Sequence, residues 1–393
     1  MRAEIGTNGS PPADAIPTSP IPMSEVQDIL VYGVMGIGNF ILMMPALQAL
    51  REGTPDARIA LLANGRGIQP IAASSGLFDE VLQLPHGFRR NPAYIPWVWK
   101  QIRGRFDLLM VPPQGTTWAL LPVTLLSKAP YRLALTRRDS YFAPLPWAYN
   151  HRIKVAEVEH EAATVARMVE YLGFGTPDLK VRPFITDEDR RHAQHHLSRS
   201  GVDRRRPRIV IHAGSSRGQP WKRWPITHFA ALCRCLAEEQ GAQVLFVGSG
   251  QEREELLAAF AGIAGPETIL AGQLDIRATT ALVESADLVV ANDSAISHLA
   301  AVTGTALVVL FGPTDERVCG PLGERCHIVA SGASCRPCYG LCRTKRVRRC
   351  RGRVCLTGIS VEQVHDACVR ALAGEFDMPA ATAGRAWGRA SQA

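Results

Sequence analysis

The stretch DLVVANDSAISHLAAVTGTALVVLFGPTDE, residues 287–316, decides the fold more than any other part of the chain. Its pattern predicts a buried strand (Asp287–Ala291), a turn, a short helix, a second apolar strand (Ala306–Phe311) and a further turn. Ser294 is placed to cap the helix, and His298 lies one helical turn further along the same side. In open parallel sheets, ligands bind beyond the carboxyl ends of the strands, where a helix N-terminus favours an anion. The stretch therefore predicts a ligand site, and we expect a ligand that carries phosphate.

The composition allows two domains with their own cores. The chain has 393 residues, of which 46% are apolar and 20% charged, ordinary values for a soluble protein. Residues 1–25 are rich in Pro, Ser and Gly and lack the apolar segment of a signal peptide, so we expect a disordered leader and a cytoplasmic protein. Residues 376–393, rich in Ala and Gly, are expected to be disordered as well. No apolar run reaches the roughly 18 residues of a membrane span, and Trp118–Ser127 predicts a core helix.

Apolar strands alternate with helical segments along the chain. Strands are predicted at Asp28–Gly33, Arg58–Ala63, Phe106–Val111, Arg208–His212, Gln243–Val247, Asp287–Ala291 and Ala306–Phe311. This alternation is typical of an α/β fold, in which helices cover both faces of a parallel sheet. The basic segment SGVDRRRPR (Ser200–Arg208) interrupts it. We therefore predict an N-terminal domain at residues 26–200, a C-terminal domain at 201–375 and a cleft between them.

The net charge of +8 indicates an anionic partner. Its densest part is RTKRVRRCRGR (Arg343–Arg353). Three interpretations stay open: a solvated basic loop, contact with an acidic substrate or an anionic lipid surface, and nucleic-acid binding. Nucleic acid is the least favoured partner, because no recognised DNA- or RNA-binding motif accompanies the charge.

The first strand leads into a glycine-rich turn, GVMGIGNFILMMPALQALR (Gly33–Arg51). Gly36 and Gly38 allow a tight turn and a close approach of the backbone to a ligand, and Asn39 is expected to open the helix. The spacing is not the G-x-G-x-x-G of dinucleotide sites, so no NAD is inferred. The alternative is that the glycines serve only the turn from strand to helix.

Two further turns carry polar residues suited to a nucleotide. In IHAGSSRGQPWKRWP (Ile211–Pro225), Ser215 and Ser216 offer N–H and hydroxyl groups to phosphate oxygens, and Lys222 adds a positive charge. In FVGSGQEREEL, Glu252 follows a strand end, where a carboxylate can accept both hydroxyls of a ribose. The alternatives are a polar loop with a surface lysine, and a glutamate that the helix dipole favours at a helix start.

Five cysteines crowd a segment of the C-terminal half. They are Cys335, Cys338, Cys342, Cys350 and Cys355. Their C-x-x-C-x-x-x-C spacing suits zinc or an iron–sulfur cluster, yet no second C-x-x-C and no histidine pair completes a familiar zinc motif. A reducing cytoplasm argues against disulfides. Free or redox-labile thiols are therefore favoured over a metal site.

Taken in order, these motifs resemble glycosyltransferase family 9, the lipopolysaccharide heptosyltransferases and their relatives, over roughly residues 29–370. The resemblance implies a GT-B fold, in which two Rossmann-like parallel-sheet domains face a central cleft. The N-terminal domain would bind the acceptor and the C-terminal domain the nucleotide-sugar. Transfer would invert the anomeric centre without a metal or cofactor. The implied donor is ADP-heptose, and the implied acceptor is an anionic glycolipid of the lipopolysaccharide-core type at the inner face of the cytoplasmic membrane.

The resemblance also assigns residues to each substrate. Those that would bind the donor are Ser215, Ser216, Lys222, Glu252, Asp293, Ser294, Ala295, His298, Gly312 and Thr314. The first three would hold the diphosphate, Glu252 the ribose, and the rest the sugar and phosphates. Ala295 replaces the glycine of the family's D-T-G-x-x-H, whereas Gly312–Thr314 keeps its F-G-P-T turn. Gly36, Gly38 and Asn39 would face the acceptor. The cysteine cluster also resembles one found in many members.

One departure from the family bears on catalysis. The first turn of heptosyltransferases ends in Gly-Asp, and that aspartate is the proposed general base, whereas here Asn39 follows Gly38. An amide has no useful basicity, so Asn39 at this catalytic position can only orient the acceptor hydroxyl. Lys222, the other residue assigned to catalysis, would stabilise the leaving diphosphate. Either another carboxylate or an acceptor phosphate is the base, or the chain is a weakened member that binds a nucleotide-sugar without efficient transfer.

Overall fold

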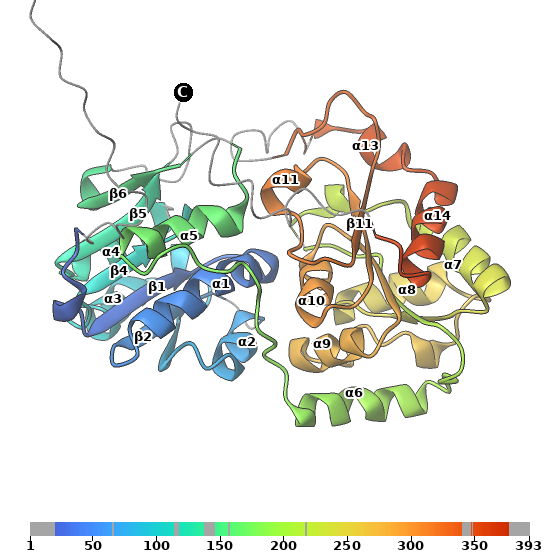
Figure 1. Ribbon diagram of the computed structural model, residues 1–393, viewed down its shortest axis with the longest axis horizontal. Helices are drawn as coiled ribbons and strands as arrows, with labels where there is room; N and C mark the ends of the chain where they lie inside the picture. The colour runs from blue at the N-terminus through green and yellow to red at the C-terminus, as the bar shows by residue number, and fades with distance from the viewer. Residues whose placement is uncertain are drawn as a thin grey trace, which may run out of the picture.

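Two domains lie side by side in the computed structural model, and each is a parallel sheet with helices packed on it (Figure 1). The structure describes residues 20–64, 67–113, 118–136, 146–155, 158–216, 218–339, 347 and 349–376. Among these residues, no helix combines the length and the apolarity that crossing a bilayer requires.

The N-terminal domain is built on a six-stranded sheet in the order β3-β2-β1-β4-β5-β6. Its strands are β1 (Asp28–Gly33), β2 (Arg58–Ala63), β3 (Glu80–Gln83), β4 (Leu108–Val111), β5 (Tyr131–Thr136) and β6 (His151–Lys154). Its helices are η1 (Met23–Glu25), α1 (Ile37–Gly53), α2 (Ile68–Ser74), η2 (Phe88–Arg90), α3 (Tyr94–Gln101), η4 (Trp118–Leu120), α4 (Leu121–Leu126), η5 (Pro146–Ala148) and α5 (Glu161–Tyr171). The strand order reverses between β1 and β4, so the switch point of this doubly wound sheet lies at the glycine-rich turn after β1.

The C-terminal domain has a five-stranded parallel sheet in the order β11-β10-β9-β7-β8. Its strands are β7 (Arg208–His212), β8 (Gln243–Phe246), β9 (Leu288–Asn292), β10 (Leu307–Phe311) and β11 (Cys326–Ala330). Its helices are η6 (Pro220–Lys222), α7 (Ile226–Gln240), η7 (Gly250–Glu252), α8 (Arg253–Ala259), η8 (Pro266–Thr268), α9 (Ile276–Glu284), α10 (Ala295–Thr303), α11 (Glu316–Cys319), α13 (Val354–Thr357) and α14 (Val361–Leu372). Here the order reverses between β7 and β9, which places the second switch point at the ends of those two strands.

The predicted strands are confirmed, most within one residue at each end. β1, β2 and β7 have the predicted bounds, because each is an apolar run whose residues are buried after the first one. The start of α1 differs from the prediction. The helix begins at Ile37 with Gly36 as its N-cap, so Asn39 is its third residue and does not open it. The side chain of Asn39 therefore points from the first turn of the helix and not from the loop.

The helix α6 (Asp187–Arg199) packs against α9 of the C-terminal domain, although it precedes the basic segment Ser200–Arg208 (Figure 1). Asp189 pairs with Arg277 at 2.8 Å, and Arg190 pairs with Glu284 at 2.6 Å. The chain thus crosses between the two sheets in the segment that joins α5 to α6. The domain boundary between residues 200 and 201 stays a prediction.

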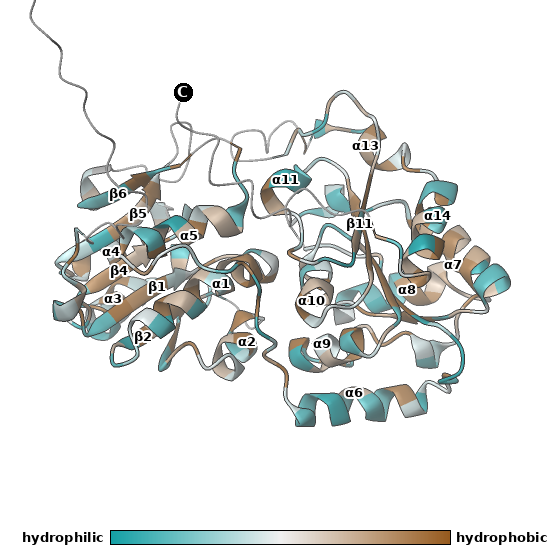
Figure 2. Ribbon diagram, in the orientation of Figure 1, coloured by the Kyte–Doolittle hydropathy of each residue, from teal (hydrophilic) through white to brown (hydrophobic). Residues whose placement is uncertain are grey.

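The apolar strands lie inside each domain, whereas α6 is largely hydrophilic (Figure 2). The two domains contact each other where α1 meets α10 and where α2 meets α9. Ile21 is completely buried in the core that holds β1, and η1 follows it, so residues 20–25 belong to the folded domain and not to a disordered leader. Residues 1–19 and 377–393, which make up the rest of the predicted leader and tail, lie outside the described residues.

Candidate active site

Three side chains from three strand ends meet at the carboxyl edge of the C-terminal sheet. Asp293 follows β9, Thr314 lies beyond β10, and Lys222 ends η6 in the segment after β7. The Lys222 Nζ lies 2.7 Å from Asp293 Oδ2, and the Thr314 hydroxyl donates to the same oxygen at 2.6 Å. Burial by itself would lower the pKa of Lys222, but the Asp293 carboxylate outweighs burial and raises that pKa, so the lysine stays charged. The edge of the sheet therefore carries a largely buried ion pair.

A second contact crosses the switch point between β7 and β9. His212 Nδ1 and Ser294 Oγ lie 2.9 Å apart, and both side chains are buried. Burial lowers the pKa of His212, so its ring is neutral at neutral pH. Ser294 is the N-cap residue of α10 and Ala295 its first residue, but the Ser294 hydroxyl makes no capping bond. The predicted cap by Ser294 is wrong, because His212 engages that hydroxyl.

Asn292, a residue not predicted to belong to the site, holds the loop that carries Ser215 in place. Its amide nitrogen donates to the carbonyl oxygens of Ala213 and Gly214 at 2.9 and 3.0 Å, and its amide oxygen accepts from the Trp224 N–H at 2.9 Å. The side chain is fully buried. These bonds fix both ends of the loop that carries Ser215. In the sequence, the signal for this role is a polar residue at the end of an otherwise apolar strand.

The predicted ribose-binding carboxylate, Glu252, is held by three donors. Its Oε2 accepts from the backbone N–H and the hydroxyl of Ser249 at 2.8 and 2.9 Å, and its Oε1 accepts from Arg223 at 3.0 Å. Arg223 also donates to the Ser215 hydroxyl at 3.1 Å, whereas Ser216 is exposed on the same loop. Arg223 thus ties two predicted donor residues together, and sequence reasoning missed it although it directly follows Lys222.

A pocket of about 290 Å³ opens beside Glu252. Its walls include Gly214, Arg223, Glu252 and Arg353, the last from the basic stretch. A Cβ on Gly214 would lie 2.0 Å from Glu252 Oε1, so a larger residue would displace this carboxylate. Within the basic stretch, residues 343–346 and 348 lie outside the described residues. With Glu255, which also lines it, the pocket combines two carboxylates with two guanidinium groups, a suitable lining for a polar ligand that carries hydroxyl groups.

The turn after β10 is supported by the segment that contains the cysteines. The carbonyl oxygen of Pro313 accepts from the N–H groups of Cys338 and Tyr339 at 2.9 and 2.8 Å. The Lys222 Nζ lies 5.6 Å from the centre of the Tyr339 ring, within range of a cation–π contact. A Cβ on Gly312 would lie 2.6 Å from Leu356, so this predicted site residue also serves close packing. The described parts of the segment from Cys338 to Leu356 therefore pack against the turn after β10, and Tyr339 contacts Lys222 of the ion pair.

The described cysteines of the cluster lie near one another. Burial, together with the neighbouring Cys338, Cys335 and Cys350, raises the pKa of Cys355 to about 11. Cys342 lies outside the described residues. Among the described residues, no three His, Cys, Asp or Glu side chains take up positions that could hold a metal ion. The Cys355 thiol is therefore protonated at neutral pH, and the metal at this cluster stays a prediction that ranks below free thiols.

On the predicted acceptor side, the amide of Asn39 meets a carboxylate. Asn39 Nδ2 donates to Glu161 Oε2 at 2.7 Å, a side chain that the sequence analysis does not assign. Glu161 is the first residue of α5, and His160 caps that helix by accepting from the Ala162 N–H at 3.3 Å. Gly36 is exposed, and a Cβ there would meet nothing within 4 Å.

The predicted site residues of the two domains meet where Gly38 faces His298. A Cβ on Gly38 would lie 2.7 Å from His298 Cδ2, so the absence of a side chain on α1 allows α10 to approach. Burial lowers the pKa of His298 to about 4, while Asp293 raises and Lys222 lowers it, which shows that the ring lies within electrostatic reach of the ion pair. Its Nδ1 is buried without a hydrogen-bond partner among the described residues.

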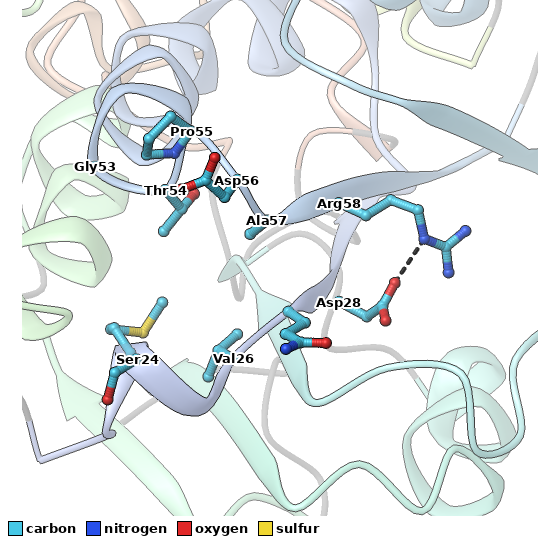
Figure 3. Close-up of a pocket in the computed structure, with 11 residues that line it drawn as sticks. Ser24, Val26, Asp28, Gly53, Thr54, Pro55, Asp56, Ala57 and Arg58 are labelled. Atoms are coloured by element: carbon cyan, nitrogen blue, oxygen red, sulfur yellow. Dashed lines mark hydrogen bonds and ion pairs between the residues drawn. The ribbon is translucent and has the colours of Figure 1, made fainter.

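A larger pocket lies away from these groups. It has a volume of about 710 Å³ and is lined by residues from Met23 to Asp28 and from Gly53 to Arg58 (Figure 3). Asp28 and Arg58, whose side chains pair at 2.6 Å, are the first residues of β1 and β2. The pocket is therefore at the amino ends of these strands, the opposite edge of the sheet from the glycine-rich turn. We do not assign it to the site.

Comparison with known proteins identifies the family to which the chain is similar. The sequence profile of glycosyltransferase family 9 (heptosyltransferase) matches residues 97–347. Lipooligosaccharide heptosyltransferase 2 of Haemophilus influenzae is 25% identical over 315 residues, which cover 77% of this chain and 88% of that protein. Lipopolysaccharide heptosyltransferase 2 of Escherichia coli is 22% identical over 317 residues, with coverage of 77% and 87%.

Solved structures show the same fold. A family 9 glycosyltransferase of Veillonella parvula superposes with a TM-score of 0.70 at 21% identity, covering 89% of this chain and 98% of its own. ADP-heptose lipopolysaccharide heptosyltransferase II of E. coli gives 0.67 at 19% identity, with coverage of 88% and 99%. The predicted GT-B fold is thereby confirmed. Since the profile matches more than half of its residues, the chain belongs to glycosyltransferase family 9 and is a glycosyltransferase.

Proposed function

We propose that the chain is an inverting, metal-independent glycosyltransferase that moves a heptose from ADP-heptose onto a lipopolysaccharide-core or related glycolipid acceptor. The observation that carries this proposal is the ion pair of Lys222 and Asp293, 2.7 Å long, at the switch point of a nucleotide-binding type of sheet. The names of the relatives supply the substrate class: one E. coli heptosyltransferase was solved with ADP-2-deoxy-2-fluoro heptose. The nucleotide-sugar is a substrate, so no cofactor is assigned.

The donor would lie across the carboxyl edge of the C-terminal sheet. Its nucleoside would enter the pocket beside Glu252, where Oε1 has one bond from Arg223 and room to accept a ribose hydroxyl. Its diphosphate would lie between the loop of Ser215 and Ser216 and the charged Nζ of Lys222. The sugar would extend toward His298 and the turn at Thr314. This order follows the sequence of groups along the edge of the sheet.

Inversion follows from a direct displacement at the anomeric carbon. The acceptor hydroxyl attacks from the face opposite the diphosphate, and the electron pair of the broken bond leaves with the diphosphate. Lys222 would offset the charge that develops on the leaving group, and removing one such preorganised group typically costs roughly 10²–10³ in rate. A protein cation placed there performs the task that a divalent metal performs in metal-dependent transferases.

The N-terminal domain carries features suited to an anionic membrane surface. The helix α4 contacts α3, η4 and η5, and these four helices carry exposed large apolar side chains. The side chains are Ile95, Trp99, Trp118, Leu125 and Trp147. The Arg103 guanidinium lies 3.4 Å from the centre of the Trp99 ring. Tryptophan and arginine are typical of surfaces that contact lipid headgroups. With the net charge of +8, they support a cytoplasmic enzyme in peripheral contact with the inner membrane face, and not a nucleic-acid-binding protein.

The alternative is a weakened family member that binds the nucleotide-sugar without efficient transfer, and Asn39 is the residue that favours it. Isothermal titration with a hydrolysis-resistant ADP-heptose, together with mass spectrometry of products from a panel of nucleotide-sugars and truncated glycolipids, separates the two. A mass increase of one heptose on the acceptor supports the transferase. Donor binding without a product from any acceptor supports the alternative and would overturn the proposed function.

A further inference from the structure

The last arginine of the basic stretch reaches the pocket that the proposed donor would fill with its nucleoside. Arg353 lines this pocket of about 290 Å³. Its Nη1 donates to the carbonyl oxygen of Pro220 at 3.3 Å, across 133 residues of chain. Pro220 begins η6, and the carbonyl oxygen of Gln219, just before it, accepts from the Ser215 hydroxyl at 2.9 Å. Arg353 is thus attached to the loop that carries the residues predicted to hold the diphosphate.

The charges of the pocket leave Arg353 available to a ligand. Of the two cations among the described residues that line it, Arg223 pairs with Glu252 at 3.0 Å and with Glu255 at 3.5 Å. In the part of the chain that the structure describes, no carboxylate lies within ion-pair distance of Arg353. The two carboxylates exceed Arg223 by one negative charge, and Arg353 cancels this excess. A guanidinium has several N–H donors, of which the Pro220 carbonyl takes one, so the others can bind an oxyanion.

The backbone of Arg353 takes a conformation that is rare for its residue type. Its φ of 43° and ψ of 39° lie in the left-handed region, which favours glycine. The following helix α13 fixes this conformation: the Leu356 N–H donates to the Arg353 carbonyl oxygen at 2.7 Å, and the side chains of Cys355 and Leu356 are buried. Strained residues of this kind cluster at functional sites. The chain therefore keeps an arginine at the pocket where a glycine would fit the backbone better.

The position of Arg353 between two groups of the proposed site indicates which part of the donor it would contact. Glu252 would bind the ribose, and the loop of Ser215 would bind the diphosphate. Arg353 lines the pocket of the first and donates a hydrogen bond to the loop of the second, so it lies at the junction of ribose and diphosphate. The donor group at that junction is the phosphate attached to the ribose. A planar guanidinium suits it, because it can bond two phosphate oxygens at once.

We propose that Arg353 is a donor-binding residue and that it binds the phosphate attached to the ribose of the nucleotide-sugar. The inference rests on the proposed function, because it adds a residue to the binding site of that function's donor. The two cations divide the diphosphate between them, with Arg353 at its nucleoside end and Lys222 at its sugar end. Of the three interpretations of the basic stretch, contact with an acidic substrate then applies to Arg353.

The test is isothermal titration of the full chain with ADP, in which Arg353→Gln is compared with Arg351→Gln. Arg351 is exposed and belongs to the same basic stretch, so its exchange removes the same charge as a matched control. We expect Arg353→Gln to weaken ADP binding by roughly 10–100-fold at low salt, the range for a hydrogen bond to a charged group. The control should stay within about twofold. Salt at about 1 M screens charges and should reduce the difference between the wild type and Arg353→Gln.

A second variant, Arg353→Gly, separates binding from folding. Glycine accepts the left-handed backbone without strain, so the melting temperature of this variant should equal or exceed that of the wild type. Its affinity for ADP should nevertheless fall as in Arg353→Gln. Melting temperatures that fall together with ADP affinity in both variants would show that Arg353 acts through folding, and would overturn its role in binding.

The remaining outcomes distinguish this inference from the proposed function. ADP binding by the wild type that is unchanged in Arg353→Gln would overturn the role of Arg353 alone. A loss of affinity that persists undiminished at high salt would show a contact with an uncharged part of the nucleotide, and would overturn the phosphate contact. An absence of ADP binding by the wild-type chain would overturn the proposed ADP-linked donor, and the inference with it.

Discussion

The two switch points of the molecule obtain their charged groups in different ways. At the C-terminal sheet, Asp293 and Lys222 each lie in the segment that directly follows a strand, and they pair at 2.7 Å. At the N-terminal sheet, the turn itself supplies only the neutral Asn39, and its carboxylate partner, Glu161, comes from the start of a distant helix. A group at a strand end is fixed by the sheet, whereas a group on a docked helix depends on packing. The proposed donor side is therefore harder to rearrange than the proposed acceptor side.

The largest expected effect comes from breaking the ion pair of the donor side. In Lys222→Ala the Asp293 carboxylate, 5% exposed, would keep only the Thr314 hydroxyl as a side-chain partner among the described residues. Removing one member of a buried pair costs about 3–5 kcal/mol of unfolding free energy. We expect a loss of that size in chemical denaturation, and transfer lowered by roughly 10²–10³-fold because the leaving diphosphate loses its cation.

The double variant Lys222→Met/Asp293→Asn separates the two consequences. It leaves no uncompensated charge, so most of the stability should return while transfer stays low. Recovery of transfer along with stability would show that Lys222 acts only on folding. The same comparison on the acceptor side, Asn39→Ala, should change unfolding free energy much less, because Asn39 is partly exposed and uncharged.

The contact between the domains should make the fold sensitive to acid. The pKa of His298 is lowered to about 4 by burial, below its ordinary value near 6.5. Between these values the unfolded chain binds a proton that the folded chain does not, so stability falls as the pH falls. From pH 7 to pH 5 the expected loss from His298 is about 2 kcal/mol. Buried His212 and His160, whose pKa values burial also lowers, act in the same direction.

Urea denaturation from pH 7 to pH 5 measures this loss, and His298→Asn is its control. The variant lacks the titrating ring, so its unfolding free energy should fall less between pH 7 and pH 5 than that of the wild type. The difference should equal the loss expected from His298. Parallel slopes for both proteins would contradict the assignment. A loss confined to the C-terminal domain would show that His298 is buried by its own domain and not by α1.

The residues of the proposed donor side were easier to bring together from the sequence than those of the proposed acceptor side, for the same physical reason. Strands such as β7 are apolar runs, and the polar residues that follow them indicate a ligand site. Asp293 and Lys222 could therefore be predicted from the sequence as site residues. Partners chosen by packing have no local pattern. The bond from His212 to Ser294, which replaces the expected helix cap, joins residues 82 apart, and the bond from Asn39 to Glu161 joins residues 122 apart.

The smallest expected effect comes from adding a side chain to the glycine-rich turn at one of two positions. A Cβ at Gly38 would meet His298 at 2.7 Å, whereas a Cβ at Gly36 would meet nothing within 4 Å. Gly38→Ser should cost at least about 1 kcal/mol through overpacking, and Gly36→Ser, at an N-cap that favours serine, should be neutral. Small-angle scattering should show the domains further apart in Gly38→Ser only. If Gly38→Ser lowers transfer but leaves donor affinity unchanged, the proposed donor side binds its ligand independently of the contact between α1 and α10, and only the proposed acceptor side depends on that contact. A fall in both donor affinity and transfer would show that both sides depend on it.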